Sequence, residues 1–200
     1  MGKLKKILFV IDNLDRGGRE RQLLELIKGL KKEECFDIKL LVFDDKKCYG
    51  NYNFDIIYFK RTKRIDLKLI YFSFKSIIRF KPDVVHFWSF FAGLIVFLPS
   101  IIIQSKLINS TLRNTHAPPK NFLKSYFRKL LFLVAHYNVS NTKLALEINN
   151  LKINNKNHVI YNGIDLNRFP ESDKKDIDKI NVIMVGRFSQ AKNHALFFNL

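Results

Sequence analysis

The chain has 200 residues, of which 47% are hydrophobic and 19 are phenylalanine; this is enough apolar material for a packed core and argues against disorder. Its formal net charge of +17 at pH 7 favours anionic partners such as nucleic acid, lipid headgroups or phosphorylated small molecules, although a compositional bias towards lysine would give the same total. Cys35 and Cys48 show no disulfide-framework spacing, and the cysteines and histidines show no zinc spacing, so we expect a reducing cytoplasm and no metal.

The first half of the chain alternates apolar runs with amphipathic segments. Lys6–Ile11 is a continuous apolar run, as in a parallel strand that is buried on both faces. A Gly17-Gly18 loop follows, and Arg19–Lys32 places leucine and isoleucine at helical spacing, with charges on the opposite side. The next predicted elements are strands over Phe36–Phe43 and Asp55–Phe59 and a basic amphipathic helix over Asp66–Lys81, which Pro82 ends.

The second half continues this alternation. The run Val84–Ile103 has about the length of a membrane-spanning helix, but Pro99 and several polar residues interrupt it, which favours a strand over Val84–Trp88 followed by a buried helix. The remaining predicted elements are strands over Lys106–Arg113, Tyr137–Ser140 and Val159–Tyr161, a helix from Phe122 to Ala135 and a short helix before the last strand. The pattern predicts an α/β fold, with a doubly wound, mostly parallel sheet and helices on both of its faces.

Polar residues gather at the predicted carboxyl ends of the strands, which is where doubly wound sheets bind ligands. They are Asp12, Gly17, Gly18, His86, Ser89, Arg113, His116, Ser140, Asn141, Asn162 and Gly163. The Gly17-Gly18 pair would let backbone amides approach an anion at a helix N-terminus, or else it is only a tight turn. Arg113 suits a phosphate or carboxylate, with a surface ion pair as the alternative. His86 is either a residue of the cleft or a buried structural histidine.

The stretch 158–187 marks a boundary in the chain. Asn162-Gly163 is a strong turn signal, since both residues tolerate positive φ. The residues after it break any strand alternation, and 171–179 is a charged segment with a single aliphatic residue. A fresh apolar strand is predicted from Ile180. One α/β unit is therefore expected to close near Gly163 and another to open near Ile180.

Two motifs in this stretch carry a resemblance to a known family. Val-Ile-Tyr-Asn-Gly-Ile-Asp-Leu-Asn-Arg-Phe at 159–169, followed by Val-Gly-Arg-Phe at 185–188 and Lys192-Asn193, resembles the inter-domain junction of GT-B glycosyltransferases of the large retaining family 4. The resemblance implies a Rossmann-like acceptor-binding domain over 1–163 and a linker over 164–179. It also implies that 180–200 begins a second, truncated Rossmann-like domain, which in the family binds the nucleotide sugar.

The same resemblance implies an activity and a set of site residues. The enzyme would transfer a hexose from a nucleotide-sugar donor to a lipid-linked or polysaccharide acceptor, with retention of configuration and without a cofactor. Arg187 and Lys192 would be the catalytic cations that neutralise the donor diphosphate as it leaves. The substrate-binding residues would be Gly17, Gly18, His86, Arg113, His116, Asn162 and Gly163. No part of the sequence matches the family's pair of glutamates, so we expect little or no transferase activity from the 200-residue chain itself.

Two basic amphipathic stretches, 60–81 and 120–131, favour contact with an anionic membrane surface. Helices packed on a sheet in a lysine-rich protein give the same pattern, so a cytoplasmic protein and one attached to the inner face of the plasma membrane both stay open. The competing function is a non-catalytic basic module that binds RNA or membranes. Most phenylalanines fall on core-like faces instead of among exposed charges, so no nucleic-acid partner is expected.

Overall fold

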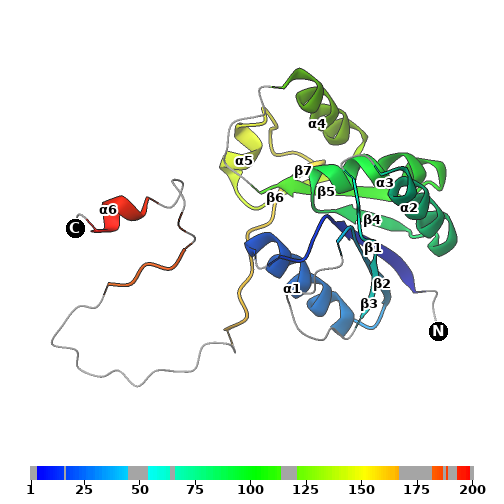
Figure 1. Ribbon diagram of the computed structural model, residues 1–200, viewed down its shortest axis with the longest axis horizontal. Coiled ribbons are helices and arrows are strands. Elements are labelled where there is room, and N and C mark those ends of the chain that lie inside the picture. The colour runs from blue at the N-terminus through cyan, green and yellow to red at the C-terminus, as the bar shows by residue number, and fades with distance from the viewer. Residues whose placement is uncertain are drawn as a thin grey trace. The chain divides into compact units, whose positions relative to one another are not determined.

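The computed structural model describes residues 4–15, 17–44, 54–63, 66–113, 121–166, 182–186, 188 and 193–198. The chain divides into two compact units, Met1–Ile164 and Asp165–Leu200, which are treated separately below. The first unit contains all the strands that the structure describes, and these appear in blue to yellow in Figure 1. The one regular element described in the second unit is the short helix α6 (His194–Phe198).

The first unit is built on a seven-stranded sheet with the strand order β3-β2-β1-β4-β5-β6-β7, in which every neighbouring pair is parallel. The strands are β1 (Lys5–Ile11), β2 (Phe36–Val42), β3 (Asp55–Tyr58), β4 (Val84–Phe87), β5 (Lys106–Leu112), β6 (Tyr137–Ser140) and β7 (Asn157–Val159). The predicted doubly wound α/β sheet is therefore confirmed. Successive strands are added on one side of β1 and then, from β4 onward, on its other side, so the switch point lies between β1 and β4.

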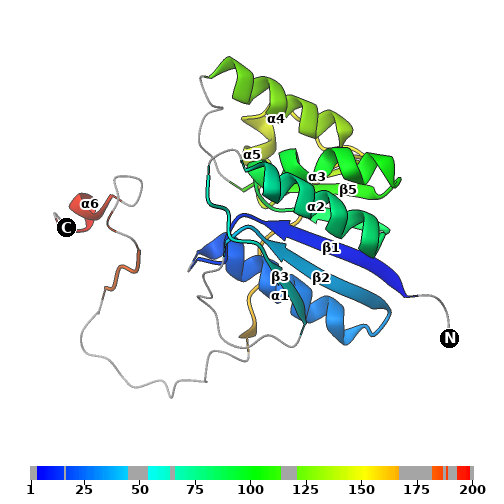
Figure 2. The same ribbon diagram turned by 45° about the vertical axis from the view of Figure 1, so that its right-hand side comes forward.

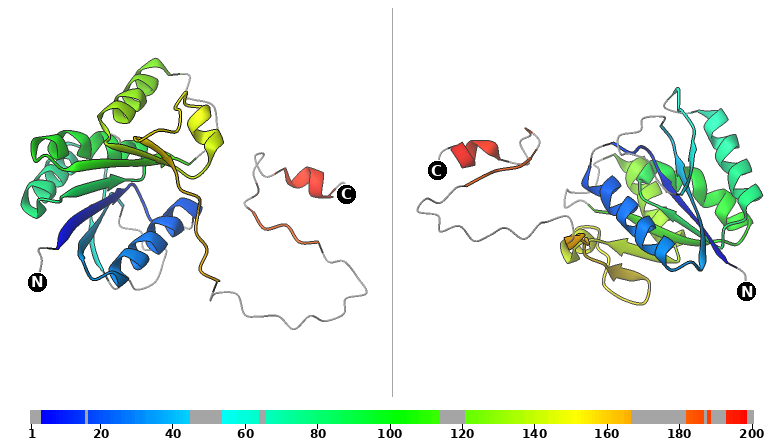
Figure 3. Two further views of the ribbon diagram at one scale, coloured as in Figure 1. Left: turned by 180° about the vertical axis from the view of Figure 1, so that it is seen from behind. Right: turned by 90° about the horizontal axis from the view of Figure 1, so that it is seen from below.

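Helices cover both faces of the sheet (Figure 2 and Figure 3). On one face, α1 (Gly18–Lys32) packs over β1 and β2 through buried residues such as Leu23 and Ile27. The other face carries α2 (Leu67–Phe80), α3 (Phe90–Ile102) and α4 (Phe122–Val134), with α3 in contact with both of its neighbours. A short helix, α5 (Lys143–Glu147), lies in the connection from β6 to β7.

Successive side chains of a strand point to opposite faces of the sheet, and the apolar ones form two cores, one on each face. In β1, Ile7, Phe9 and Ile11 pack with the buried residues of α1, whereas Leu8 and Val10 pack with those of α2 and α3. The run therefore appears apolar throughout, because both of its faces are buried. These cores hold the strands and the first turns of the helices in place at the carboxyl edge of the sheet.

Gly93 lets α3 lie close to the sheet. A Cβ at this position would lie 2.7 Å from Phe87 Cε2 and 2.8 Å from Leu131 Cδ1, so any side chain here would push α3 away from β4 and α4. α3 has 13 residues, and none of the helices in the described part of the chain has the length and apolar character needed to cross a membrane. The strand and the helix predicted over Val84–Ile103 are confirmed, but α3 is buried on one side only, since Leu98, Ile101 and Ile102 are exposed.

Three buried asparagines tie the last three strands together. The register pairs Asn109 of β5 with Asn138 of β6, and Asn138 with Asn157 of β7. Asn109 Nδ2 donates to Asn138 Oδ1 at 3.0 Å, and Asn138 Nδ2 donates to Asn157 Oδ1 at 2.9 Å and to the Phe132 carbonyl of α4 at 3.1 Å. We call this set the asparagine ladder. Because each buried amide has its partner on the next strand, the ladder specifies the register of this half of the sheet.

The structure corrects three local predictions. β7 begins at Asn157 and ends at Val159, so it lies two residues earlier than expected. Asn162 and Gly163 form no turn and neither has a positive φ, because their polar groups are used in contacts with α1 and β5 that are described below. Residues 182–185 are not a strand: a strand needs a hydrogen-bonded neighbour, and the described part of the second unit contains none. The predicted domain limits stay a prediction.

Candidate functional site

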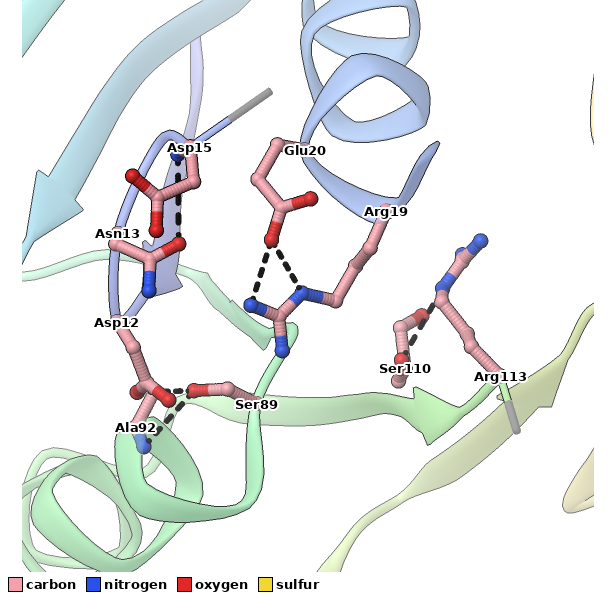
Figure 4. Close-up of polar contacts among 9 residues, drawn as sticks. All are labelled: Asp12, Asn13, Asp15, Arg19, Glu20, Ser89, Ala92, Ser110 and Arg113. Atoms are coloured by element: carbon pink, nitrogen blue, oxygen red, sulfur yellow. Dashed lines mark hydrogen bonds and ion pairs between the residues drawn. The ribbon is translucent and has the colours of Figure 1, made fainter. Parts of the chain in front are cut away.

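The carboxyl ends of β1 and β4 are joined by side chains at the switch point. Ser89, which precedes α3, donates its hydroxyl to Asp12 Oδ1 (Figure 4). The same hydroxyl oxygen accepts a hydrogen bond from the Ala92 amide at 3.2 Å and so caps α3. Asp12 and Ser89, which the sequence placed at two strand ends, therefore fix the position of α3 relative to β1.

The N-terminus of α1 lies at the same edge of the sheet. Gly17 is the N-cap residue and, having no side chain, contributes no side-chain cap hydrogen bond. A Cβ added to Gly18 would meet no heavy atom within 4 Å, and the φ of Gly18 is not positive. Neither packing nor backbone conformation therefore requires glycine at position 18. An uncapped helix N-terminus with open space beside it is the geometry in which backbone amides bind an anion.

Arg19 adds a guanidinium group to this helix end. Its Nε and Nη2 both donate to Glu20 Oε1, at 3.0 and 2.7 Å. Glu20 is buried and Arg19 is partly exposed, so the buried carboxylate holds a guanidinium that still reaches solvent. In Figure 4 the Arg19 guanidinium lies between Glu20 and Ser89.

Arg113 brings a second guanidinium from the end of β5. Its Cζ lies 3.8 Å from the centroid of the Trp88 ring, Nε donates to the Ser110 carbonyl at 3.2 Å and Nη1 donates to Asn162 Oδ1 at 3.2 Å. Burial, followed by the nearby positive charge of Arg19, lowers the pKa of Arg113 to about 10. Within the described residues Arg113 has no carboxylate partner, so two cations share this edge and an anion between them would be stabilised.

His86 lies beneath this cationic edge. Its ring is buried between Phe9 and Trp88, with centroids 5.2 and 5.3 Å away, and Nε2 is 2.7 Å from Ser110 Oγ. Burial, followed by the charge of Arg113, lowers the pKa of His86 to about 3, so the ring is neutral at pH 7. In this place His86 packs against Trp88 and fixes Ser110, which in turn holds Arg113. Its expected contact with substrate stays a prediction.

The segment Ile160–Ile164 passes across the edge to α1. Gln22 Nε2 donates to the Gly163 carbonyl at 2.7 Å, and the Gly163 amide donates to Gln22 Oε1 at 3.1 Å. Together with the contact between Arg113 and Asn162, this pair brings Asn162 and Gly163 into the same group as the N-terminus of α1. The structure thus gathers Gly17, Gly18, Arg113, Asn162 and Gly163 at one edge, with His86 directly below.

Sequence reasoning missed two residues of this group. Gln22 lies four residues after Gly18, on the same side of α1, and that spacing was the available signal. Trp88 is the single tryptophan of the chain and follows β4 directly. It stacks under Arg113, and its buried Nε1 has no hydrogen-bond partner among the described residues. His116, Arg187 and Lys192 lie outside the described residues. Among those that are described, no group of three or more histidine, cysteine, aspartate or glutamate side chains could hold a metal ion.

Residues 16–168 match the family model for Glycosyltransferase Family 4. The chain belongs to glycosyltransferase family 4. The resemblance seen in the sequence is therefore confirmed at the level of the family. No curated protein matches the chain.

Solved GT-B structures share the fold at low sequence identity. HepE from Anabaena, in a complex with UDP and glucose, has a TM-score of 0.62 and 16% identity over 84% of this chain and 47% of its own. The apo form of the lipopolysaccharide outer core galactosyltransferase WaaB has a TM-score of 0.63 and 14% identity over 80% and 46%. A glycosyltransferase from Rickettsia africae has a TM-score of 0.61 and 18% identity over 82% and 44%. The family 4 chain thus spans a little under half the length of each of these structures.

Proposed function

We propose that this family 4 chain is the acceptor-side part of a GT-B glycosyltransferase that takes a hexose from a nucleotide-sugar donor. The observation that carries the proposal is the cationic edge, where Arg19 and Arg113 meet the uncapped N-terminus of α1 at Gly18. HepE has been solved with UDP-glucose, which supports a donor of this class for a chain of the same fold.

The chemistry that such an edge can supply is electrostatic. When the bond between the sugar and the donor diphosphate breaks, negative charge develops on the phosphate that leaves. Fixed guanidinium groups and helix amides stabilise that charge without reorganising. Arg187 and Lys192, which the family motif marks as the catalytic cations, would stabilise the donor diphosphate as it leaves. Retention of configuration and a lipid-linked or polysaccharide acceptor are part of the proposal and follow from the family alone.

The single tryptophan provides a direct test on the 200-residue chain. Because Arg113 stacks on Trp88 at 3.8 Å, an anion that draws the guanidinium away changes the surroundings of the indole. Titration with UDP-glucose, other nucleotide sugars and pyrophosphate is expected to change the Trp88 emission until the site is saturated. Replacement Arg113→Gln is expected to weaken binding by roughly 10- to 100-fold, since a hydrogen bond to a charged group contributes about 1.5–3 kcal/mol.

Two glycines of α1 supply a matched pair of variants. Gly18→Ala places a methyl group in the open space beside the first amides and is expected to weaken binding by about tenfold or more. Gly29→Ala adds the same methyl group where nothing lies within 4 Å, farther along the helix, and is expected to bind like the parent. If no nucleotide sugar or pyrophosphate changes the emission, or if both alanine variants behave alike, the proposal is wrong. Salt-sensitive RNA binding in place of these responses would favour the non-catalytic module.

A further inference from the structure

One layer of helices contains cations but no acidic residue. α2, α3 and α4 lie side by side on the same face of the sheet, and none of them contains aspartate or glutamate. Their basic residues are Lys68, Lys75, Arg79, Lys124, Arg128 and Lys129. A surface of this kind has a positive potential that no carboxylate on the three helices reduces.

Large apolar side chains on these helices point away from the core. Leu67 is 75% exposed and Phe122 is 85% exposed. Further exposed residues of the three helices are Ile70, Tyr71, Phe74, Leu98, Ile101, Ile102, Leu123, Tyr126 and Leu133. We call the exposed apolar and basic residues of α2, α3 and α4 the α2–α4 face. An exposed apolar surface that extends over three neighbouring helices marks an interaction site.

Leu67 and Phe122, the two most exposed residues of the α2–α4 face, lie in the first turns of α2 and α4. Each of these helices follows a strand and returns antiparallel to it, so its first turns lie at the carboxyl edge of the sheet. Two contacts reach the first turn of α3: Arg61 Cζ, in the loop before α2, lies 4.6 Å from the Phe91 ring centroid, and Lys124 Nζ of α4 lies 6.0 Å from that of Phe90. The loop before α2 adds the exposed Lys60 and Lys63.

α1, on the opposite face of the sheet, shows that composition alone does not produce such a surface. It contains five basic residues but also Glu20 and Glu25, and Leu26, at 36%, is its single exposed large apolar residue. A lysine-rich and phenylalanine-rich composition would affect all four helices alike. Among α1 to α4, the combination of cations, exposed apolar side chains and missing carboxylates occurs on the α2–α4 face and not on α1.

We propose that the α2–α4 face docks on an anionic lipid bilayer. Lysine and arginine side chains would meet anionic headgroups, while Leu67, Tyr71, Phe122, Leu123 and Tyr126 would enter the boundary between headgroups and acyl chains. Charge complementarity supports this partner, because an anionic bilayer carries the negative charge that the α2–α4 face lacks. Docking would leave the carboxyl edge beside the membrane surface. The proposal does not depend on glycosyl transfer.

The test is co-sedimentation of the 200-residue chain with vesicles of phosphatidylcholine alone or of phosphatidylcholine with one quarter phosphatidylglycerol, at low and high salt. Binding is expected only to the anionic vesicles, and it is expected to weaken at high salt. Lys68→Gln combined with Lys124→Gln and Lys129→Gln is expected to weaken binding roughly a hundredfold, since each lysine contributes a factor of about five. Leu67→Ser combined with Phe122→Ser and Leu123→Ser is expected to abolish sedimentation with the vesicles.

Matched control variants make the test specific. Lys31→Gln with Lys32→Gln and Lys152→Gln removes three exposed cations elsewhere, and Leu144→Ser with Ile153→Ser removes exposed apolar side chains elsewhere. Both controls are expected to bind anionic vesicles like the parent. Equal binding to both vesicle types, or equal loss in the controls, would overturn the proposal. The proposal would also be overturned if the parent chain did not bind vesicles and formed a dimer that the Leu67→Ser combination converts to a monomer. A second copy of the chain would then cover the α2–α4 face.

Discussion

Replacement of Asn138 by leucine removes the middle of the asparagine ladder. The variant leaves three buried groups without the partners they have in the structure: Asn109 Nδ2, Asn157 Oδ1 and the Phe132 carbonyl. Each buried polar group that loses its partner costs about 1–3 kcal/mol, and part of this is recovered when the neighbours relax. We therefore expect a loss of about 3–5 kcal/mol from the free energy of unfolding, a large part of the roughly 5–15 kcal/mol that stabilises a domain.

Urea unfolding followed by circular dichroism measures this loss. With a slope of about 2 kcal/mol per molar urea, the midpoint is expected to fall by roughly 1.5–2.5 M. Asn155→Leu, at an exposed asparagine close to β7, is the control and is expected to change stability by less than about 0.5 kcal/mol. Adding Asn157→Leu to the first variant is expected to cost less than the two single changes together, because both remove the same hydrogen bond. A loss below about 1 kcal/mol at Asn138 would refute the assignment of register to the ladder.

Two further predictions concern the packing below the candidate site. Gly93→Ala is expected to destabilise the chain by about 1–3 kcal/mol in the same urea assay, because its Cβ would lie 2.7 Å from the Phe87 ring; a neutral change would show that α3 can move away freely. The folded-state pKa of His86 is about 3, below its usual 6.5, so stability is complete above pH 6.5 and is lost as the pH falls towards 3. The slope would be up to about 1.4 kcal/mol per pH unit, and His86→Gln is expected to flatten it between pH 6 and 4; an unchanged slope would contradict the burial argument.

Much of the sheet was predictable because its strands carry a strong local signal. Lys6–Ile11 is apolar at every position after its first, since both faces of β1 are covered, and its strand assignment was correct. The β5–β7 half was harder, since polar Asn109, Asn138 and Asn157 occupy buried positions and resemble loop residues when the sequence is considered alone. Their hydrogen bonds join residues that lie far apart in the chain, which no local pattern can show.

The site was predictable as a region but not as a set of contacts. Parallel strands place their carboxyl ends at one edge, so the grouping of Gly18, Arg113 and Asn162 followed from topology. The turn predicted at Asn162-Gly163 was wrong, because Gln22 and Arg113 hold the two residues by hydrogen bonds in a conformation that is not a turn. The burial of His86 under Trp88 depends on how three strands and α1 pack together, which residue types alone do not specify.

If the cationic edge binds an anion as proposed, the contact between Arg113 and Asn162 would couple that binding to the conformation of the segment after β7. Asn162 Oδ1 and a bound anion would compete for the Arg113 guanidinium, so each would weaken the other's interaction with it. Thermodynamic linkage makes this effect equal in both directions. An anion that takes Arg113 would leave Ile160–Ile164 attached through Gln22 of α1 and through the Ile160 amide, which donates to the Ser140 carbonyl at 2.8 Å. A rearrangement that frees Arg113 from Asn162 would raise the affinity for the anion by the same factor. The conformation of the segment after β7 would then depend on whether an anion is bound at the candidate site.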